Sequence, residues 1–334
     1  METQSNLRLD TSNALQSYIP RNTNQVWSPE GLVQFITNIC TAAHPDSSLR
    51  KTADLLTANL SKAPESNQAL KRYVGIAGSP GGFSDAFYST ITKTKDVLVE
   101  NDIFKLNALV HRLTEGMLPY VVHPQDVSNT AFVVQVFKDT WLNTMRLTTL
   151  KFKSRDLTEK TVDAITGSFL NAFETTGKKQ TVITLPYASN YMAIVVLSNT
   201  IDEYVDFSEI WNEENWSQIG VVETRRPDSL EKCIYLPKFK CRSEVSLNGV
   251  MRSLGMGNLD GIFNPNVPFP KDSKQVTYIE VDEIGTKAAA ATMIRLSRGF
   301  GTKKETYVID RPFGFAVIDK NSKTIEFAAL IENL

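Results

Sequence analysis

Apolar residues in the first part of the chain recur at three- and four-residue spacing, which is the period of an amphipathic helix. The pattern predicts helices over Leu9 to Tyr18 and Pro29 to Cys40. Ser28, directly before Pro29, is a start signal, because a Ser side chain caps the first backbone N–H groups and Pro suits the first helical position. From Glu65 to Gly82 the chain is polar and then rich in Gly, Ser and Pro, which predicts a loop.

From Ala131 onward, short apolar runs rich in β-branched residues replace the helical pattern and predict strands. These strands are expected over Ala131 to Phe137, Gln180 to Pro186, Met192 to Leu197, Cys233 to Lys238, Tyr278 to Val281, Phe313 to Ile318 and Ile325 to Leu330. Two further helices are expected over Thr158 to Ile165 and Leu247 to Leu254. Helices followed by strands favour an α+β fold with antiparallel or mixed sheets. No linker divides the strand-rich part, so residues 1–334 are expected to form a single domain.

Charge and hydropathy exclude several classes of partner. The chain has 334 residues and a net charge of −1, with no run of five like charges, so neither nucleic acid nor a membrane surface is an expected partner. No segment has 18 consecutive apolar residues, and the N-terminus has no basic and apolar signal pattern. We therefore expect a cytoplasmic protein, although secretion without a cleavable signal stays open.

Residues that could carry catalysis or bind metal are sparse. The sequence has no GxGxxG after a strand, no GxxxxGK[ST], no GxSxG and no HExxH, so an enzyme is not expected. No metal or other cofactor is expected, because no His lies at ligand spacing from a Cys or an acid. The histidines are His44, His111 and His123. The cysteines, expected to be buried free thiols, are Cys40, Cys233 and Cys241.

The segment 283–307 has no clear core pattern and is long for a connection inside a compact domain. Its four consecutive Ala residues could form a short helix. At a period of two, however, one set of positions is small or apolar and the other carries Lys, Arg and Ser. The first set is Thr286, Ala288, Ala290, Thr292, Ile294 and Leu296. The segment therefore suits both a loop and a strand between two others, with Gly285 as a flexible start.

This segment carries a family resemblance. Glu283-Ile284-Gly285-Thr286-Lys287-Ala288-Ala289-Ala290-Ala291-Thr292 resembles the serpin hinge E-x-G-T-E-A-A-A-A-T, and Asp310 to Phe315 is similar to the serpin C-terminal signature. Further matches follow in family order from about residue 10 to residue 334. They are Val26-Trp27-Ser28-Pro29, Thr114-Glu115-Gly116, Phe137-Lys138-Asp139-Thr140-Trp141, Leu185-Pro186-Tyr187, Leu236-Pro237-Lys238-Phe239 and Leu254-Gly255-Met256.

The resemblance implies the serpin fold: an α+β domain of three β-sheets surrounded by helices, with an exposed reactive-centre loop at 283–307. The shortened N-terminal helical region is similar to that of the compact poxvirus serpins, which implies viral immune evasion in a host cytoplasm. The implied function is suicide-substrate inhibition of a protease, in which the cleaved loop inserts into the large sheet and traps the acyl-enzyme. The implied state is a metastable monomer that can form loop–sheet polymers.

Roles of individual residues follow from the resemblance. The hinge residues are Glu283, Gly285, Thr286, Ala288, Ala289, Ala290 and Ala291. Lys238 resembles the partner of Glu283 at the point of insertion, called the breach. Trp141 resembles the aromatic residue packed there, although an ordinary core role fits it equally. Small hinge residues favour inhibition over the alternative, a non-inhibitory serpin that acts as a binding or chaperone-like protein.

The reactive bond is expected twelve or thirteen positions after Thr286, at Arg298-Gly299. Arg298 fits the acidic pocket of a trypsin-like serine protease, and a cysteine protease that accepts Arg is a further possible target. Arg295 is the alternative bait residue, but cleavage there would leave a short insertable arm. Some poxvirus serpins inhibit caspases through Asp at the bait position, and Arg298 argues against that target.

Two residues depart from the family pattern. The family usually has Asn where this chain has Val133, and His where it has Gln275. The resemblance places both, with Ser28, in a polar network beneath the centre of the large sheet, called the shutter. We expect this network to differ here and to alter the energetics of sheet opening.

Overall fold

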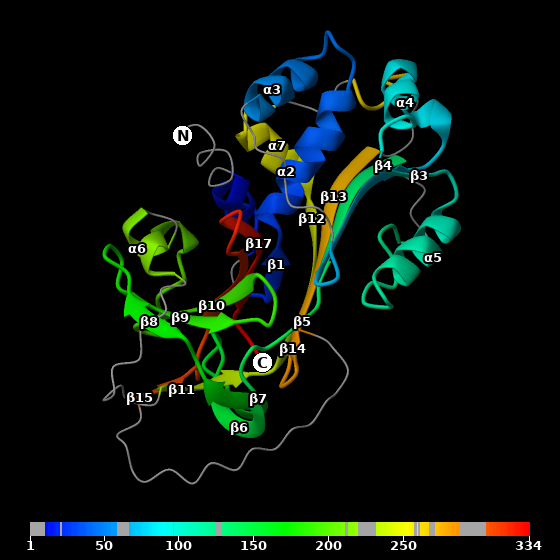
Figure 1. The fold of residues 1–334 in the computed structure, drawn as a ribbon. Coiled ribbons are helices and arrows are strands. Elements are labelled where there is room, and N and C mark those ends of the chain that lie inside the picture. The colour runs from blue at the N-terminus through cyan, green and yellow to red at the C-terminus, as the bar shows by residue number, and fades with distance from the viewer. Residues whose placement is uncertain are drawn as a thin grey trace. The chain divides into compact units, whose positions relative to one another are not determined.

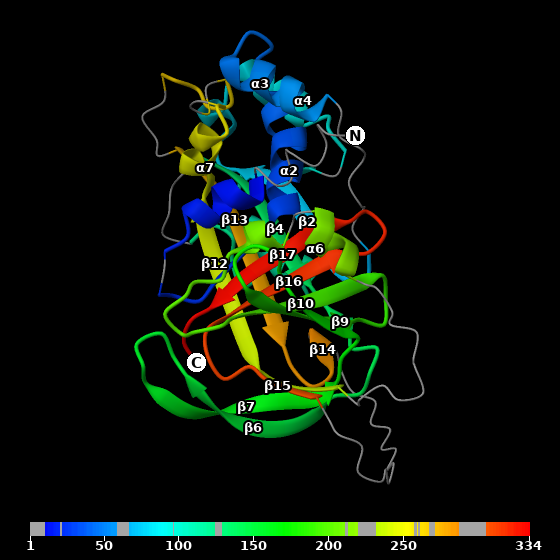
Figure 2. The ribbon, with the colours of Figure 1, turned by 90° about the vertical axis from the view of Figure 1, so that its left-hand side faces the viewer.

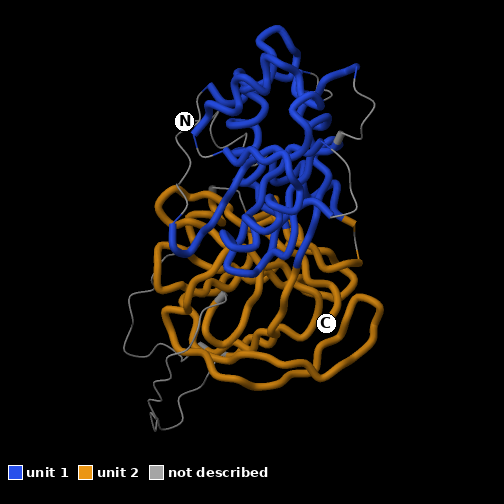
Figure 3. Tube along the Cα trace, turned by 90° about the vertical axis from the view of Figure 1, so that its right-hand side faces the viewer, with its two compact units in different colours: residues 1–19, 27–136, 242–278 blue, residues 20–26, 137–241, 279–334 orange. Residues whose placement is uncertain are grey.

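The computed structural model describes residues 11–20, 22–58, 67–95, 97–123, 129–210, 213–219, 232–256, 259, 261–266, 271–286 and 305–334. The chain groups into two compact units, each built from segments that are far apart in the sequence (Figure 3). Unit 1 comprises residues 1–19, 27–136 and 242–278, and unit 2 comprises residues 20–26, 137–241 and 279–334. The expectation of a single domain stays a prediction.

Unit 1 contains most of the helices. Residues 11–17 are helical, and the labelled helices are α2 (Pro29–Asn38), α3 (Ser48–Thr57), α4 (Asp85–Ile91), α5 (Ile103–Leu113) and α7 (Leu247–Ser253) (Figure 1). Short 3-10 turns lie at Cys40–Ala42 and Pro80–Gly82. The predicted start of α2 is confirmed: the Ser28 hydroxyl accepts the Gly31 N–H at 2.8 Å. The predicted helix over Leu247 to Leu254 is also confirmed, as α7.

The five-stranded sheet of unit 1 has the order β12-β13-β4-β2-β3 (Figure 2). Its strands are β12 (Phe239–Ser246), β13 (Lys271–Val281), β4 (Asn129–Phe137), β2 (Leu70–Ala77) and β3 (Val97–Glu100). The central neighbours β4 and β13 are parallel and in register, with Gln275 opposite Val133 and Val276 opposite Val134. Their seam, the line along which β4 and β13 are hydrogen-bonded, is important for the site below.

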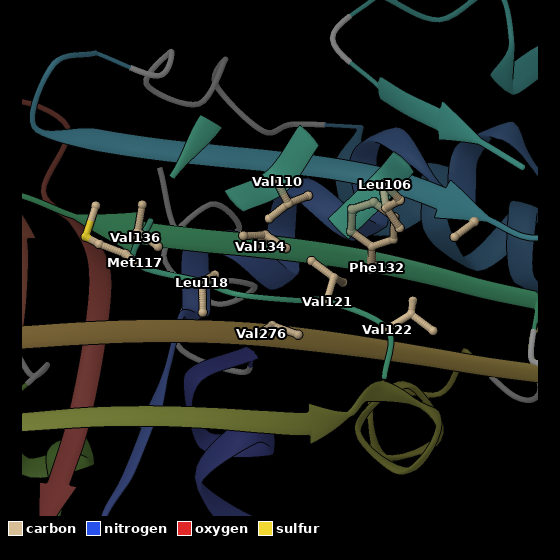
Figure 4. Close-up of a cluster of buried hydrophobic side chains, with 11 residues drawn as sticks. Leu106, Val110, Met117, Leu118, Val121, Val122, Phe132, Val134, Val136 and Val276 are labelled. Carbon is tan, nitrogen blue, oxygen red and sulfur yellow. The ribbon is translucent and has the colours of Figure 1, made fainter. Parts of the chain in front are cut away.

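The two faces of this sheet have different neighbours. Phe132, Val134 and Val136 of β4 share a buried apolar cluster with Val276 of β13 and with Leu106 and Val110 of α5 (Figure 4). Because side chains alternate along a strand, Val133, Gln135 and Gln275 point to the opposite face. That face carries the polar contacts of Ser28 at the start of α2.

Unit 2 consists mainly of two sheets. The six-stranded sheet has the order β1-β17-β16-β10-β9-β8, from β1 (Gln25–Trp27), β17 (Thr324–Ile331), β16 (Phe313–Asp319), β10 (Tyr191–Ser198), β9 (Gln180–Pro186) and β8 (Asn171–Glu174). The four-stranded sheet has the order β15-β11-β7-β6, from β15 (Glu305–Val308), β11 (Lys232–Pro237), β7 (Glu159–Ser168) and β6 (Arg146–Lys153). Unit 2 also contains helix α6 (Glu213–Gln218) and a 3-10 turn at Phe207–Glu209.

All seven predicted strands are present, most of them longer by a residue or more at one end or both. The strand predicted over Tyr278 to Val281 is the end of the much longer β13. Its first half was missed because Lys271 to Lys274 read as polar. Lys274 is nevertheless buried, because its ammonium group pairs with Glu244 at 2.7 Å.

Two predictions about local structure are wrong. The predicted helix over Thr158 to Ile165 is strand β7, which pairs on both sides with β6 and β11. Its Thr and Val residues are β-branched and suit a strand once partners are available. The predicted loop over Glu65 to Gly82 contains strand β2. Its Gly75 marks a close approach to β3 rather than a loop, since a Cβ there would lie 2.4 Å from the Leu98 carbonyl oxygen.

Candidate functional site

The hinge begins with a two-residue strand. Strand β14 (Gly285–Thr286) pairs antiparallel with β5 (Asp139–Thr140), which follows β4 in the chain. Gly285 has φ +154°, and a Cβ there would lie 2.0 Å from the Asp139 carbonyl oxygen. Any side chain at this position would collide with the β5 backbone, so the pairing requires Gly285.

A tight turn at Asp282 leads into β14. The Asp282 carboxylate accepts the N–H groups of Ile284 at 2.9 Å and Gly285 at 3.1 Å. The Asp282 N–H donates to the Gly285 carbonyl at 2.9 Å. These bonds satisfy the backbone of the turn locally, as Asp side chains commonly do. Sequence reasoning did not assign Asp282 to the site, although an Asp three residues before a Gly is a turn signal.

Trp141 holds the same turn through its backbone and its indole. Its N–H donates to the Ile284 carbonyl at 3.0 Å, and its Nε1–H donates to the Asp282 carbonyl at 2.8 Å. The indole stacks on Tyr187 with ring centroids 4.6 Å apart and planes 10° apart. Trp141 is 7% exposed, so it is both a core residue and a direct contact of the hinge. The breach role and the ordinary core role that the sequence left open for Trp141 are therefore compatible.

Lys238 and Glu283 form an ion pair beside this turn, with 2.7 Å between Nζ and Oε2. Both side chains are nearly one-third exposed. The hydrogen bond to Lys238 lowers the pKa of the Glu283 carboxyl, and the bond to Glu283 raises the pKa of the Lys238 ammonium group. The ion pair thus links Lys238, directly after β11, to Glu283, two residues before β14. The hinge residues Glu283, Gly285 and Thr286 are thus gathered with both breach residues in unit 2.

The three shutter residues lie together in unit 1. The Gln275 amide bonds the backbone of Ser28 twice: it accepts the N–H at 2.7 Å and donates to the carbonyl at 2.8 Å. Ser28 and Gln275 are fully buried. A buried amide that meets both polar groups of one residue satisfies them fully and fixes the start of α2 to β13.

Val133 lies directly opposite Gln275 and contributes no polar atom. Gln135, two residues further along β4, supplies one instead. Its Oε1 accepts the Ser28 hydroxyl at 2.7 Å and the Arg72 Nε–H at 2.7 Å. The sequence analysis missed Gln135 and Arg72. The available signal was a single Gln in the apolar run from Ala131 to Phe137, which must find a partner once it is buried.

The remaining predicted site residues lie outside the described residues. They are Ala288, Ala289, Ala290, Ala291, Arg295, Arg298 and Gly299. Where the chain is described, no group of three His, Cys, Asp or Glu residues could hold a metal ion. In those same ranges no helix has both the length and the apolar character needed to span a membrane.

Comparison of the sequence with known protein families and known proteins finds similarity to serpins. The family model "Serpin (serine protease inhibitor)" matches residues 82–334. The chain is 25% identical over 269 residues to mouse macrophage plasminogen activator inhibitor 2, covering 73% of this chain and 64% of that protein. It is 24% identical over 289 residues to human neuroserpin, covering 78% and 65%. A serine protease inhibitor of Cyanea capillata is 28% identical over 179 residues, covering 49% and 45%. The matches thus span less than two thirds of each relative.

Solved structures show the same fold. The crystal structure of Serpin48 from the insect Tenebrio molitor has a TM-score of 0.74 at 19% identity, covering 100% of this chain and 97% of that one. The thermophilic serpin tengpin in its native state has a TM-score of 0.75 at 18% identity, covering 99% and 93%. The predicted α+β serpin fold with three main sheets and surrounding helices is therefore confirmed.

Proposed function

The chain belongs to the serpin family, and from that premise we propose that it inhibits a trypsin-like serine protease as a suicide substrate cleaved at Arg298-Gly299. The observation that carries the proposal is the pairing of β14 with β5. Because β5 follows β4 in the chain, this pairing starts the hinge antiparallel to the strand beside which the insertable arm, residues 286–296, would lie. The protease-inhibitor names of the relatives support the coarser part of the proposal.

The first step is an ordinary acyl transfer. The serine hydroxyl of the protease attacks the Arg298 carbonyl carbon, the peptide bond to Gly299 breaks, and the new Gly299 amino group takes up a proton. Residues 1–298 are then held to the protease as an ester, which water normally hydrolyses. Inhibition requires that the arm moves before that hydrolysis and distorts the protease site that stabilises the oxyanion.

The register of the hinge supports a definite position for the arm. Gly285 pairs with Thr140 and Thr286 with Asp139. Continued along β4 in the same register, this pairing sets Ala288 opposite Phe137, Ala290 opposite Gln135 and Thr292 opposite Val133. Partners in an antiparallel pair point to the same face. The small, apolar set of the arm would therefore face the side of the sheet on which α2 begins.

The strand arrangement supports a gain in stability on insertion. Strands β4 and β13 are parallel neighbours over eight residue pairs, from Lys271–Asn129 to Tyr278–Val136. An arm that follows β13 and turns back between the two strands runs antiparallel to both. One parallel ladder is thereby exchanged for two antiparallel ladders, and antiparallel pairing is slightly the more stable per residue. Each added backbone hydrogen bond contributes about 0.5–1.5 kcal/mol net.

The test is to incubate the full chain with trypsin-like proteases and separate the products on a denaturing gel. We expect a covalent band at the summed mass of the protease and residues 1–298, and a released fragment that begins at Gly299. Arg298→Ala should abolish the band, and the matched control Arg295→Ala should retain it. Loop cleavage without a covalent band, in the wild-type chain, would refute the proposal and favour a non-inhibitory serpin.

A further inference from the structure

Strand β6 lies at one edge of the four-stranded sheet of unit 2 (Figure 2). Within the described ranges it pairs as a strand with β7 alone, and the register from Arg146 to Lys153 is continuous. Its eight residues include neither Pro nor Gly. Natural proteins protect edge strands with Pro, with bulges or with charged side chains. The first two of these protections are absent from β6.

Every second residue of β6 has its backbone N–H on the open edge. The N–H of Lys153 points to this side and donates to the Asp310 carbonyl at 2.8 Å, whereas the N–H of Ser154 points back toward β7 and donates within the hairpin at 2.8 Å. Because this direction alternates along a strand, the residues at two-residue spacing before Lys153 also present their N–H and C=O groups to the open edge. These open-edge residues are Leu147, Thr149 and Lys151.

The side chains of the open-edge residues do not block the edge. All three are exposed, and Leu147 is 62% exposed. Lys151 carries the one charge among them, and its ammonium group lies 3.1 Å from the Glu159 carboxylate of β7. This ion pair offsets the charge that would otherwise repel an approaching basic strand. An exposed Leu on a regular edge favours contact with a further strand, so the third protection is weak as well.

A second copy of β6 fits this edge in an antiparallel register centred on Thr149. Thr149 then lies opposite Thr149 of the second copy, and Leu147 lies opposite Lys151. All N–H and C=O groups of the open-edge residues gain partners in this register. On the other face, Arg146 lies opposite Phe152. The basic residues of one copy thus do not face basic residues of the other, which would oppose pairing.

Registers shifted by two residues fit less well. A shift in one direction places Leu147 opposite Lys153, whose N–H is already bonded to Asp310. A shift in the other direction places Lys151 opposite Met145, which precedes the strand. The centred register is therefore the one that uses the whole open edge.

We propose that two copies of this chain associate through their β6 edges and join their four-stranded sheets into one continuous sheet with two-fold symmetry. The resemblance implied a monomer, whereas the open edge points to a dimer. A contact between two strand edges is small beside the roughly 1,000 Å² that a stable interface needs, so the association is weak and reversible. The inference is independent of the proposed function, because neither the insertable arm nor the reactive bond takes part in the contact.

The test is sedimentation equilibrium of the full chain over about a hundredfold range of concentration, because mass action favours the dimer at high concentration. The average mass of the wild type should rise toward that of a dimer and should return to that of a monomer on dilution. Thr149→Pro removes the N–H at the centre of the register and should weaken association about tenfold, because each chain loses one hydrogen bond to the other. This N–H points away from β7, so the pairing within the chain is kept.

Opposite charges at Thr149 test the register itself. Thr149 faces its own copy in the centred register, so Thr149→Lys and Thr149→Glu should each associate about fivefold more weakly than wild type through like-charge repulsion. A mixture of these two variants should regain the association of the wild type, because opposite charges then face each other. Ser168→Lys is the matched control: it adds a charge to an exposed position of β7 beyond the last pair with β6 and should associate like wild type.

Two results with the wild type would overturn the dimer. If the wild type stays monomeric at every concentration, the edge is left to a strand of another protein and the proposal is wrong. Association that does not reverse on dilution would indicate loop–sheet polymers and would also overturn it.

The variants decide whether β6 is the contact. Association of Thr149→Lys, Thr149→Glu and wild type to the same extent would place the contact elsewhere and refute the proposal. Failure of the mixed variants to regain association would refute the two-fold pairing centred on Thr149. These charge variants also carry the test if Thr149→Pro does not fold.

Discussion

Replacing Gln275 by Met should weaken the tie between β13 and the start of α2. Met has nearly the length of Gln and fills the same space, so the change removes two hydrogen bonds with little cavity. The Ser28 N–H, now bonded at 2.7 Å, would be left buried without this partner, whereas the Ser28 carbonyl, now bonded to Gln275 at 2.8 Å, would keep the Leu32 N–H at 3.2 Å. One unsatisfied backbone group costs about 1–3 kcal/mol and one lost hydrogen bond about 0.5–1.5 kcal/mol, so the free energy of unfolding should fall by about 1.5–4.5 kcal/mol.

The assay is unfolding of the full chain in urea, with the midpoint and the slope of the first transition compared between variants. An unchanged slope with a lower midpoint reports a loss of stability rather than a change in compactness. Thr277→Val is the matched control, on the same strand and the same face. The buried Thr277 hydroxyl has no hydrogen-bond partner in the described part of the chain, so this change should cost nothing or stabilise.

The reasoning would be refuted by a loss below about 1 kcal/mol for Gln275→Met, which is less than one unsatisfied group should cost. It would also fail if Thr277→Val were equally destabilising, because the loss would then reflect packing of β13 in general. Gln135→Met offers an independent comparison, since it removes the bond to the Ser28 hydroxyl but leaves both Ser28 backbone bonds in place.

Three further outcomes follow from the described contacts. Glu283→Gln should lower the melting temperature at neutral pH. The difference from wild type should vanish as the pH falls through the lowered pKa of Glu283, because protonation of the carboxylate removes the stabilisation that the ion pair provides. An unchanged difference at low pH would contradict the ion-pair account. Gly285→Ala should unpair β14 from β5 and increase the share of cleaved over covalently bound chain on a denaturing gel, whereas an unchanged share would show that this pairing does not assist insertion. Val133→Asn with Gln275→His should restore the usual family residues and change both the thermal stability and the inhibition rate; if neither changed, the departures at Val133 and Gln275 would be without consequence.

Local signals in the sequence predicted the framework well. The apolar runs predicted β9, β10, β16 and β17 of the six-stranded sheet, because each run is buried on both faces and its pattern needs no partner to be recognised, whereas the short strands β1 and β8 were not predicted. Thr158 to Ile165 failed for the opposite reason. Its helical reading depended on a weak local pattern, and only pairing with β6 and β11 makes it the strand β7. Gly75 likewise indicates a loop until β3 lies against it.

The candidate site was predicted through motifs and only in part. Glu283, Gly285 and Thr286 of the hinge lie with Lys238 and Trp141, but no motif indicated the turn at Asp282, and the match Leu185-Pro186-Tyr187 did not indicate that Tyr187 stacks on Trp141. Gln135 was missed because its partner Ser28 lies 107 residues away.

The two-residue strand β14 has a kinetic consequence. Zippering of a strand is slow mainly because its first contact must be found by diffusion, at the entropic cost of closing a loop. Here that contact already exists in the intact protein, since Gly285 and Thr286 are paired with β5. Cleavage at Arg298 would therefore release a segment whose nucleus is formed and whose local concentration at the sheet is high. Whether insertion precedes hydrolysis of the ester would then depend on the rate at which the strand elongates, because no search for a first contact is needed.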